Sequence, residues 1–295
     1  MAAISVVIPT FDRCHRVVRA VRSVLCQEET DFEVLIIDDG STDGTAAAIA
    51  QLEDARVSYV FQDNAGRSAA RNLGIDRARA KVIVFLDSDD EARPDWLRLL
   101  LAAFDQDTGV VSCAAAMVRE GSPADSAHRV MRPHVRGPVY YGFSGLFLAG
   151  TFAVRTDVAR RAGGYEVGLD HAENTDFALR FLRVLHERGL EARVVDKVLV
   201  NYRTAPTPRR DPAKVLAAME HLLSAHGARY QRLAPDGYAR ICAIAGVNAS
   251  RVRRRSDAVR FFLRAGHQAP LQMKHWMRAG IALLPPIADR LWDDD

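Results

Sequence analysis

Residues 81–90 read KVIVFLDSDD, and this stretch decides the fold. The five apolar residues at 82–86 predict a strand that is buried on both faces of a sheet. Three carboxylates follow within four positions, at Asp87, Asp89 and Asp90. Open α/β sheets bind ligands just beyond the carboxyl ends of their strands, and a hard divalent cation would relieve the repulsion among these acids. A solvated turn is the alternative, since Asp and Ser are ordinary turn residues.

Three earlier apolar runs predict strands at residues 4–8, 32–37 and 57–61. Helical patterns separate these strands: one at residues 13–27, one that follows residues 41–43 and ends near 52, and one that begins at the Gly66 turn. Strands that alternate with helices predict a parallel, doubly wound sheet. Polar or acidic residues follow three of the four strands, so they should meet at one edge of that sheet. This convergence favours a binding site over a solvated turn.

The second half of the chain predicts more strands, a long loop and a helical end. We expect a helix that starts at Pro94, helices at 156–162 and 173–187, and strands at 110–118 and 194–200. We expect a loop at 120–138 and an aromatic, strand-like wall at 140–154, whose rings could stack on a sugar or an apolar acceptor: Tyr140, Tyr141, Phe143, Phe147 and Phe152. The proline-rich residues 206–212 predict a linker, followed by helices at 215–226, 238–249, 257–265 and 271–284. The predicted domains are therefore residues 1–205 and a helical C-terminal subdomain at 206–295.

Composition and charge narrow the class of protein. The 295 residues are 48% apolar and 26% charged, and four widely spaced cysteines without a Cys-x-x-Cys pair indicate a reduced, cytoplasmic setting. The N-terminus lacks the pattern of a signal peptide, and no apolar run is long enough to span a membrane. From residue 206 onward 15 Lys/Arg face 8 Asp/Glu, although the whole chain has a net charge of only +3. Such a basic region often meets anionic lipid, an anionic acceptor or nucleic acid, and a solvated helical face is the alternative. The sharpest basic cluster is 251–255. An amphipathic helix could either contact the inner face of a membrane or pack onto the first domain; it would include Trp276, Met277, Leu283, Leu284, Lys274, Arg278 and Arg290.

Four motifs together resemble one known family. They are VIPTFD at 7–12, IDDGSTD at 37–43, NAGRSAARNLG at 64–74 and FLDSDD at 85–90, and their order and spacing resemble the family 2 glycosyltransferases of the GT-A fold. The resemblance covers roughly residues 4–203. It implies a Rossmann-like, mostly parallel sheet flanked by helices, a nucleotide-sugar donor (UDP-sugar first), a Mn²⁺ or Mg²⁺ ion, and inversion at the anomeric carbon. The acceptor would be a glycan, a lipid-linked molecule or a small molecule, in the synthesis of a cell-surface glycan or a glycosylated natural product, and no nucleic acid would bind.

The same resemblance assigns donor-side residues by position. The nucleotide-binding set would be Pro9, Thr10, Asp12, Asp39, Arg71, Asp87 and Ser88. Within it, Asp39 would accept a hydrogen bond from the base, Arg71 would lie near it, and Asp87 would approach the ribose. Asp89, together with Asp90, would bind the metal ion that bridges the diphosphate.

GGYE at 163–166 and ENTDFALR at 173–180 resemble the acceptor-side segment of the family, with one departure from its pattern. The family usually has Glu-Asp where this chain has Glu173-Asn174, and an amide cannot accept the proton of the acceptor hydroxyl. Glu173, Asp176 or His171 could act as the base, and we favour Glu173 because it adjoins the vacated position. Asp176 has a structural alternative, an ion pair with the arginine four residues later on its helix. The family's metal-binding His after residues 201–203 is also missing, since the chain continues Thr-Ala-Pro.

Other classes of protein fit less well. A nucleotidyltransferase should carry a Gly-rich, basic loop after the first strand, and residues 9–15 contain no glycine. A dehydrogenase is disfavoured because no Gly-x-Gly-x-x-Gly follows that strand. The second hypothesis is a nucleotide-sugar-binding protein with weak or lost transferase activity, because the usual base and the usual His are both absent.

Overall fold

The computed structural model describes residues 2–133, 139–140, 143–204 and 210–284, with only the backbone described at 139–140 and 143–144. The chain divides into two compact units, which we describe separately. The first comprises residues 1–137, 143–168 and 173–207, and the second comprises 138–142, 169–172 and 208–295. Two short internal segments therefore group with the C-terminal helices, and nothing in the sequence pattern indicates this.

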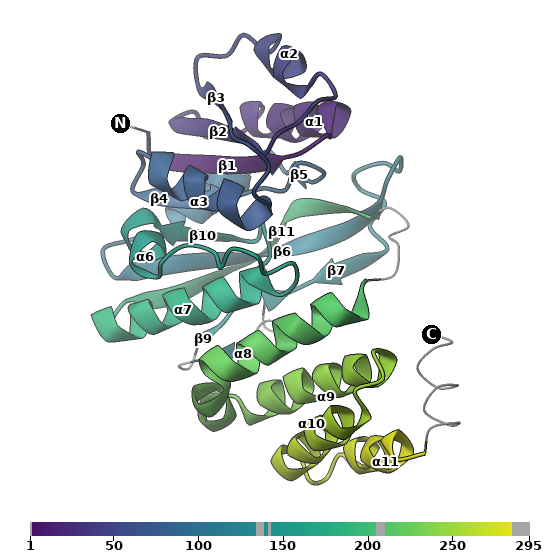
Figure 1. Cartoon of the computed structure of the whole chain (residues 1–295). Helices are drawn as coiled ribbons and strands as arrows, with labels where there is room; N and C mark the ends of the chain where they lie inside the picture. Colours follow the sequence, from purple (N-terminus) through teal and green to yellow (C-terminus); the bar gives the residue numbers. More distant parts are fainter. Residues whose placement is uncertain (1, 134–138, 141–142, 205–209, 285–295) are drawn as a thin grey trace. The chain divides into compact units, whose positions relative to one another are not determined.

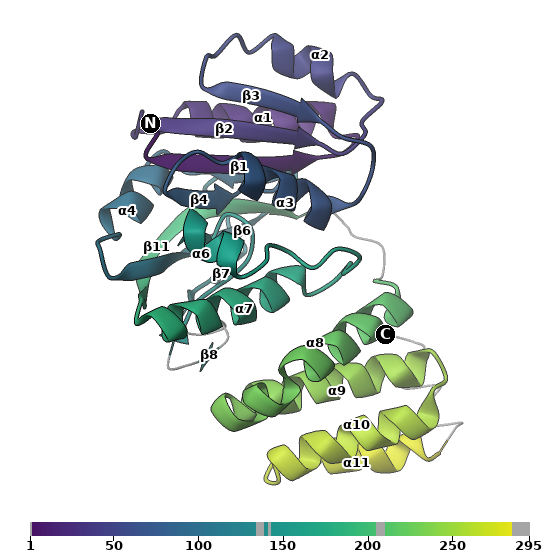
Figure 2. The same cartoon turned by 60° about the vertical axis from the view of Figure 1, so that its left-hand side comes forward.

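The first unit begins with the predicted parallel strands. They are β1 (Ile4–Thr10), β2 (Phe32–Asp38), β3 (Val57–Phe61) and β4 (Val82–Phe85), joined by α1 (Cys14–Leu25), α2 (Thr45–Ala50) and α3 (Arg67–Arg77). The strands lie in the order β3-β2-β1-β4 and all pair in parallel, as Figure 2 shows. Val7 of β1 is in register with Phe85 of β4 on one side and Leu35 of β2 on the other. The doubly wound architecture is thus confirmed.

The sheet continues past β4 with mixed strand directions. The order is β4-β10-β6-β11-β5, made of β10 (Phe152–Arg155), β6 (Thr108–Arg119), β11 (Glu191–Thr204) and β5 (Glu91–Ala92). Strand β10 is antiparallel to both β4 and β6, β11 is parallel to β6, and β5 is antiparallel to β11. The order and mixed directions give the GT-A type of sheet that the sequence resemblance implies.

Three predictions for this half need correction. Residues 120–138 do not form an uninterrupted loop, because β7 (Arg129–Met131) pairs with β6; residues 134–138 lie outside the described residues. The aromatic wall at 140–154 is not one strand but the short strands β8 (Val139–Tyr140), β9 (Phe143–Ser144) and β10, and Tyr141 is not among the described residues. The helix α4 (Trp96–Ala102) begins two residues after Pro94, since Asp95 is its N-cap.

Helices cover both faces of the sheet. Helices α1 and α4 pack on one face, in a core that includes Val17, Val21 and Trp96. On the other face lie α3, α6 (Thr156–Arg161) and α7 (Glu173–Arg188), as Figure 1 shows. An aromatic cluster fills the second layer: Phe85, Phe147, Phe152, Tyr165, Phe177 and Phe181. Helix α3 approaches β1 so closely that a Cβ at Gly74 would lie 2.3 Å from a methyl carbon of Val7.

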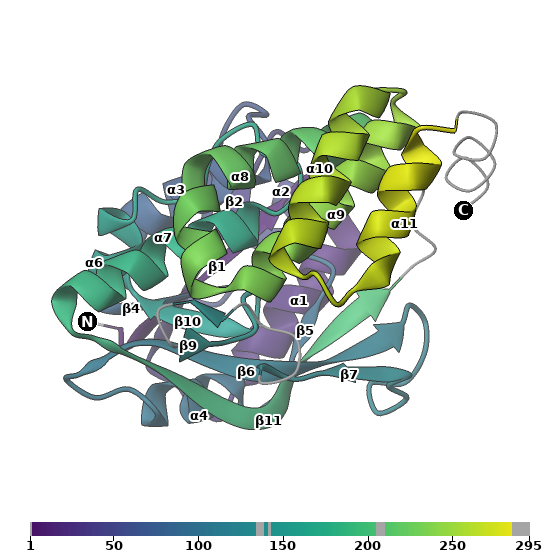
Figure 3. The same ribbon diagram turned by 90° about the horizontal axis from the view of Figure 1, so that it is seen from below.

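The second unit contains four helices: α8 (Pro212–Leu233), α9 (Pro235–Arg251), α10 (Arg255–Gln268) and α11 (Met273–Ala282). Each of α8, α9 and α10 packs against the next helix along the chain, and Figure 3 shows the group from below. The first three extend beyond the predicted bounds, and α11 is shorter than predicted. The Asp211 side chain caps α8 by accepting a hydrogen bond from the Ala213 N–H at 2.9 Å. Most of the linker predicted at residues 206–212 lies outside the described residues. Among the described helices, none has both the length and the apolar character needed to cross a membrane.

Candidate functional site

The candidate site lies where the winding of the sheet reverses. The chain moves from β1 outward through β2 to β3 and then returns to β4 on the other side of β1. Loops at the carboxyl ends of β1 and β4 diverge there, so a ligand can enter between them. Thr10 ends β1, and Asp87, Asp89 and Asp90 follow β4. The predicted donor-side residues are therefore brought to one edge of the sheet.

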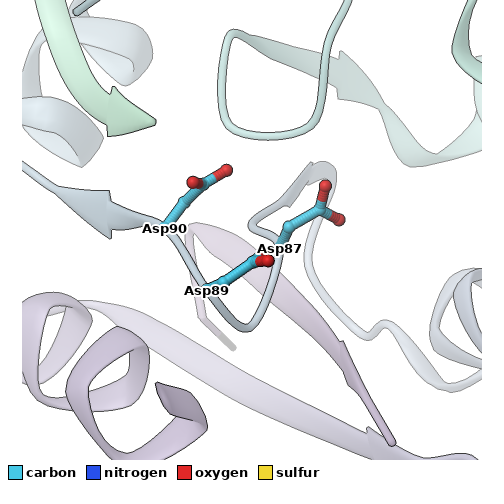
Figure 4. Close-up of side chains that lie close together, drawn as sticks. All are labelled: Asp87, Asp89 and Asp90. Atoms are coloured by element: carbon cyan, nitrogen blue, oxygen red, sulfur yellow. The ribbon is translucent and has the colours of Figure 1, made fainter. Parts of the chain in front are cut away.

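The three aspartates form a compact acidic cluster. One carboxylate oxygen from each lies within 4.8 Å of the others, and Figure 4 shows the three side chains on the loop between β4 and β5. Each carboxylate also has one oxygen held by the protein. Asp87 Oδ1 lies 2.6 Å from the Arg71 guanidinium, Asp89 Oδ2 lies 2.8 Å from Arg13, and Asp90 Oδ1 accepts from the Arg203 N–H at 2.9 Å. The second oxygen of each side chain is the one available to a ligand.

The electrostatics of the cluster favour a bound cation. Burial, followed by the nearby Asp87, raises the pKa of Asp89, although Arg13 opposes the shift. Burial, followed by Asp87 and Asp89, raises the pKa of Asp90 well above its ordinary value. The charged forms of both groups are therefore destabilised in the protein alone, and a divalent cation would reverse this.

A network of side chains fixes the acidic loop to its neighbours. The Arg19 guanidinium donates to the Asp89 carbonyl at 2.9 Å and pairs with Glu91 at 2.9 Å and Glu120 at 2.6 Å. The Arg203 guanidinium shares Glu91 at 2.7 Å, while its backbone N–H holds Asp90. The loop is thus anchored to both α1 and β11.

The donor set fits a hard cation such as Mg²⁺ or Mn²⁺. It consists of carboxylate oxygens only, which these ions prefer. Arg13 is 42% exposed, so a cation can compete with it for Asp89 at small cost. At the position just after residues 201–203, the Thr204 hydroxyl donates to the Val118 carbonyl at 3.2 Å and is not directed to the cluster. Within the described residues, the protein ligands to such an ion would be the three aspartates.

Arg71 connects the acidic cluster to the predicted acceptor side. Its side chain is 1% exposed, and its guanidinium lies 2.6 Å from Asp87 and 3.3 Å from Glu173. It also lies over the Tyr165 ring, 5.0 Å from the centroid. Burial alone would lower the pKa of Arg71, but Asp87 and Glu173 outweigh it and raise the pKa. The sequence resemblance places Arg71 near the nucleobase. The structure shows in addition that its guanidinium contacts the carboxylates of Asp87 and Glu173.

Tyr165 contacts both the Arg71 guanidinium and the Asn174 side-chain amide. The sequence resemblance includes it in the acceptor-side segment but gives it no individual role. The Asn72 side chain accepts from the Tyr165 N–H at 2.6 Å and donates to its carbonyl at 2.9 Å. The Tyr165 hydroxyl donates to Asn174 Oδ1 at 3.1 Å, and the Asn174 amide contacts Glu173 Oε1 at 3.4 Å. Asn72, a member of the 64–74 motif, therefore contacts the predicted acceptor side through Tyr165. The resemblance at 163–166 indicates that side, but no sequence signal indicates the contact with Asn72.

The residues predicted to bind the nucleoside lie at the ends of β1 and β2. The buried Thr10 hydroxyl has no hydrogen-bond partner among the described residues, so it is available to a ligand. Asp12, whose φ is 46°, accepts from the Thr42 N–H at 2.8 Å, and its own N–H donates to Ser41. Pro9 is buried within β1, and Ser88 is buried on the loop that follows β4.

Asp39 has a structural task in addition to its predicted one. Its carboxylate accepts from the Gln62 amide at 2.6 Å and from the Ala65 and Gly66 N–H groups at 2.8 Å. It therefore holds the turn that starts α3, and only part of its acceptor capacity is left for a base.

The three candidate bases differ in their surroundings. Every contact that the structure gives Glu173 is made through Oε1, with Arg67, Arg71 and Asn174, so Oε2 has no partner among the described residues. Asp176 is 1% exposed, and its Oδ2 pairs with Arg180 at 2.6 Å, as the four-residue spacing predicts. Arg180 in turn caps the end of α6 by donating to the Ala162 and Gly164 carbonyls. His171 belongs to the second unit.

Comparisons with known proteins agree with this description. The model of the family "Glycosyl transferase family 2" matches residues 5–162. The chain is 43% identical over 110 residues to an uncharacterized glycosyltransferase of Rickettsia conorii, covering 37% of this chain and 18% of that protein. It is 41% identical over 103 residues to the succinoglycan biosynthesis protein ExoO of Rhizobium meliloti, covering 35% of this chain and 30% of that protein. The chain thus spans less than a third of the length of either relative.

Solved structures share the fold. The crystal structure of S. aureus TarS residues 1–349 in complex with UDP-GlcNAc superposes with a TM-score of 0.68 at 17% identity, covering 97% of this chain and 88% of that one. The mannosyltransferase PcManGT from Pyrobaculum calidifontis, in complex with GDP-Man and Mn²⁺, gives a TM-score of 0.54 at 17% identity, covering 99% of this chain and 88% of that one. The fold of the chain is therefore the GT-A fold of glycosyltransferases, with C-terminal helices.

Proposed function

Because the chain belongs to glycosyl transferase family 2, we propose that it transfers a hexose from a nucleoside-diphosphate sugar to an acceptor hydroxyl, with inversion at the anomeric carbon. One observation carries this proposal: Arg71 joins the acidic cluster at Asp87 to a carboxylate with a free oxygen at Glu173. A donor diphosphate and an acceptor hydroxyl need these two features side by side.

The acidic cluster would hold the divalent cation. Asp89 and Asp90, with the free oxygen of Asp87, would bind Mn²⁺ or Mg²⁺, and such an ion neutralises the charge of a diphosphate leaving group. The buried hydroxyl of Thr10 and the carboxylates of Asp12 and Asp39 would bind the nucleoside. UDP is the first nucleotide to test, because TarS binds UDP-GlcNAc on the same fold.

Glu173 would be the general base. Its Oε2 would accept the proton of the acceptor hydroxyl as the hydroxyl oxygen attacks the anomeric carbon and the bond to the diphosphate breaks. One such displacement inverts the configuration. Arg67 and Arg71 hold Oε1, so they orient the carboxylate without occupying the second oxygen. Asp176 is a weaker candidate because its carboxylate is buried against Arg180.

The acceptor would belong to cell-surface glycan synthesis. The relatives include the succinoglycan protein ExoO and a Campylobacter jejuni enzyme named as a β-1,3-glucosyltransferase that acts on a GalNAc(5)-diNAcBac-PP-undecaprenol. A glycan or lipid-linked oligosaccharide is therefore the first acceptor class to test, followed by small-molecule acceptors.

The test is Glu173→Gln assayed with UDP-, GDP- and dTDP-sugars in Mn²⁺. We expect turnover to fall by ~10²–10⁴ while donor affinity is preserved, since a general base contributes about that factor. Glu187→Gln is the matched control, because Glu187 lies on the same helix and is exposed. Near-normal turnover of Glu173→Gln would refute the assignment and shift the role to Asp176 or His171.

The second candidate function is nucleotide-sugar binding without transfer. Asn174 in place of the usual acid, and Thr204 hydrogen-bonded to Val118, favour it. A wild-type protein that binds the donor but neither transfers nor hydrolyses it, with any acceptor class, would support this function instead.

A further inference from the structure

A groove of about 580 Å³ lies between α9 and α11 in the second unit. Three cationic side chains line it, Arg240, Lys274 and Arg278, against one carboxylate, Asp236. The buried amide of Asn248 and the ring of His275 also line it. None of these lining residues belongs to the site described above, so the groove calls for its own explanation.

The cationic side chains of this groove are not paired with carboxylates among the residues that the structure describes. Within the described part of the chain, no salt bridge or hydrogen bond joins the side chains of Arg240, Lys274 or Arg278 to a carboxylate. By contrast, Arg254, in the cluster at 251–255 that the sequence singles out, pairs with Glu220 at 2.8 Å and Asp257 at 2.7 Å. The groove therefore has a surplus of positive charge that an anionic ligand can use.

His275 adds a buried, unsatisfied polar atom to the groove. The residue is 3% exposed; its Nε2 contacts Gln272 at 3.1 Å, and its Nδ1 has no hydrogen-bond partner among the described residues. Burial, followed by Lys274 and Arg278, lowers the pKa of His275. A bound anion would favour the protonated ring, in which both nitrogens donate. A buried polar atom without a partner is uncommon in proteins and is consistent with a ligand that supplies one.

The surface of α11 beside the groove exposes an apolar stripe. Met273 is 66% exposed and Met277, one turn further along α11, is 62% exposed; Leu284, two residues past the end of the helix, is 51% exposed. Lys274 and Arg278 are each the next residue along the helix, so a cationic stripe runs beside the apolar one. Just before the helix, Leu271 is 95% exposed. A single exposed apolar residue is normal, whereas a row of them beside cations is typical of helices that lie in a membrane interface.

We propose that α11 and the α9–α11 groove form a binding surface for an anionic phospholipid membrane. The groove takes the phosphate headgroups through Arg240, Lys274, Arg278 and His275. Leu271, Met273 and Met277 enter the boundary between headgroups and acyl chains. An acidic protein or nucleic acid would use the cations but would leave the apolar row exposed to water, so a lipid surface accounts for both stripes.

The test is cosedimentation of the full chain with two kinds of vesicle, phosphatidylcholine alone and phosphatidylcholine mixed with phosphatidylglycerol. We expect binding to the mixed vesicles that weakens with salt. Lys274→Gln/Arg278→Gln should lower the partition coefficient roughly 25-fold, since each cation near an anionic surface contributes about a fivefold factor. Met273→Ser/Met277→Ser should also weaken binding. The controls on α10 are Arg260→Gln, whose side chain is 74% exposed, and Leu263→Ser, which is 37% exposed; both should bind as the wild type does.

Several results would overturn the proposal. Equal binding to both kinds of vesicle, or an equal loss in the α10 controls, would show that the groove cations do not recognise the lipid. Calorimetric binding of inorganic phosphate without vesicle binding would identify the groove as a site for a free anion. Concentration-dependent self-association that Met273→Ser/Met277→Ser abolishes would identify the apolar row as an interface between copies of the chain. None of these readouts depends on transferase activity.

Discussion

Replacement of Arg71 by methionine tests the link between the two halves of the proposed catalytic site. The guanidinium is 1% exposed and contacts two carboxylates, Asp87 at 2.6 Å and Glu173 at 3.3 Å. Methionine fills the space but leaves both carboxylates without their shared cation. Removal of one partner from a buried ion pair costs ~3–5 kcal/mol. Because Asp87 is 29% exposed, water can compensate in part, and we expect a loss of ~3 kcal/mol in the free energy of unfolding.

The assay is urea-induced unfolding followed by fluorescence in a Trp276→Phe/Trp292→Phe background. The chain has three tryptophans, so this background leaves Trp96, which is fully buried in the core of the first unit. Arg98→Met is the control, because Arg98 and its partner Glu28 are both 49% exposed, and it should lose much less stability. Addition of Glu173→Gln to Arg71→Met should recover part of the loss, since it removes a buried charge that would keep only its 3.6 Å pair with the half-exposed Arg67. A loss below ~1 kcal/mol for Arg71→Met, or strictly additive effects in the double variant, would refute the buried bridge.

Three further predictions test the packing and electrostatics of the site. Asp90→Asn should stabilise the metal-free protein at neutral pH, because burial, Asp87 and Asp89 raise the pKa of Asp90 in the folded state. The wild type therefore loses stability as the pH rises from the ordinary value of 3.8 through the raised folded pKa. Melting temperatures at several pH values in EDTA that change equally with pH in both proteins would contradict this. Gly74→Ala should lower the free energy of unfolding in urea by ~1–3 kcal/mol, because the new Cβ would lie 2.3 Å from a methyl carbon of Val7. The control Gly280→Ala should lower it by nothing, because a Cβ there meets no atom within 4 Å, and equal effects of the two variants would show that α3 can move away from β1. Tyr165→Phe should lower the free energy of unfolding by about 1 kcal/mol, because Asn174 Oδ1 loses its 3.1 Å hydrogen bond. The affinity for the nucleotide-sugar donor should not change, and a large loss of that affinity would mean that Tyr165 contacts the donor.

The sequence predicts the N-terminal half of the first unit well, for physical reasons. Strands β1 to β4 are short, mainly apolar runs rich in β-branched residues, and polar, Gly or Asp residues follow most of them, so few alternative assignments fit. Asp87, Asp89 and Asp90 were predictable as a cluster because all three follow β4 within four positions, and the parallel pairing of β4 with β1 explains why they lie at the same sheet edge as Thr10. The ion pair between Asp176 and Arg180 follows from helical spacing alone.

The rest depends on tertiary contacts that local pattern does not encode. The antiparallel insertion of β10 between β4 and β6 brings Tyr165 beneath Arg71, and no periodicity indicates that placement. The grouping of residues 169–172 with the C-terminal helices is likewise set by contacts distant in sequence. The basic cluster at 251–255 was the clearest charge signal, yet Arg254 is paired, while Lys274 and Arg278 pair with no carboxylate among the described residues. Charge counts along a sequence cannot distinguish cations that pair with carboxylates in the folded protein from cations that do not.

The most direct test of the central claim is calorimetric titration of the wild-type protein with UDP, GDP and dTDP, in Mn²⁺ and in chelator. Our account predicts that one of these nucleotides binds tightly in Mn²⁺, that chelator abolishes this binding, and that Asp89→Ala abolishes it too while the melting temperature of the metal-free protein shows an intact fold. Nucleotide affinity that is the same with and without metal, and unchanged in Asp89→Ala, would contradict the assignment of the acidic cluster as the metal and diphosphate site.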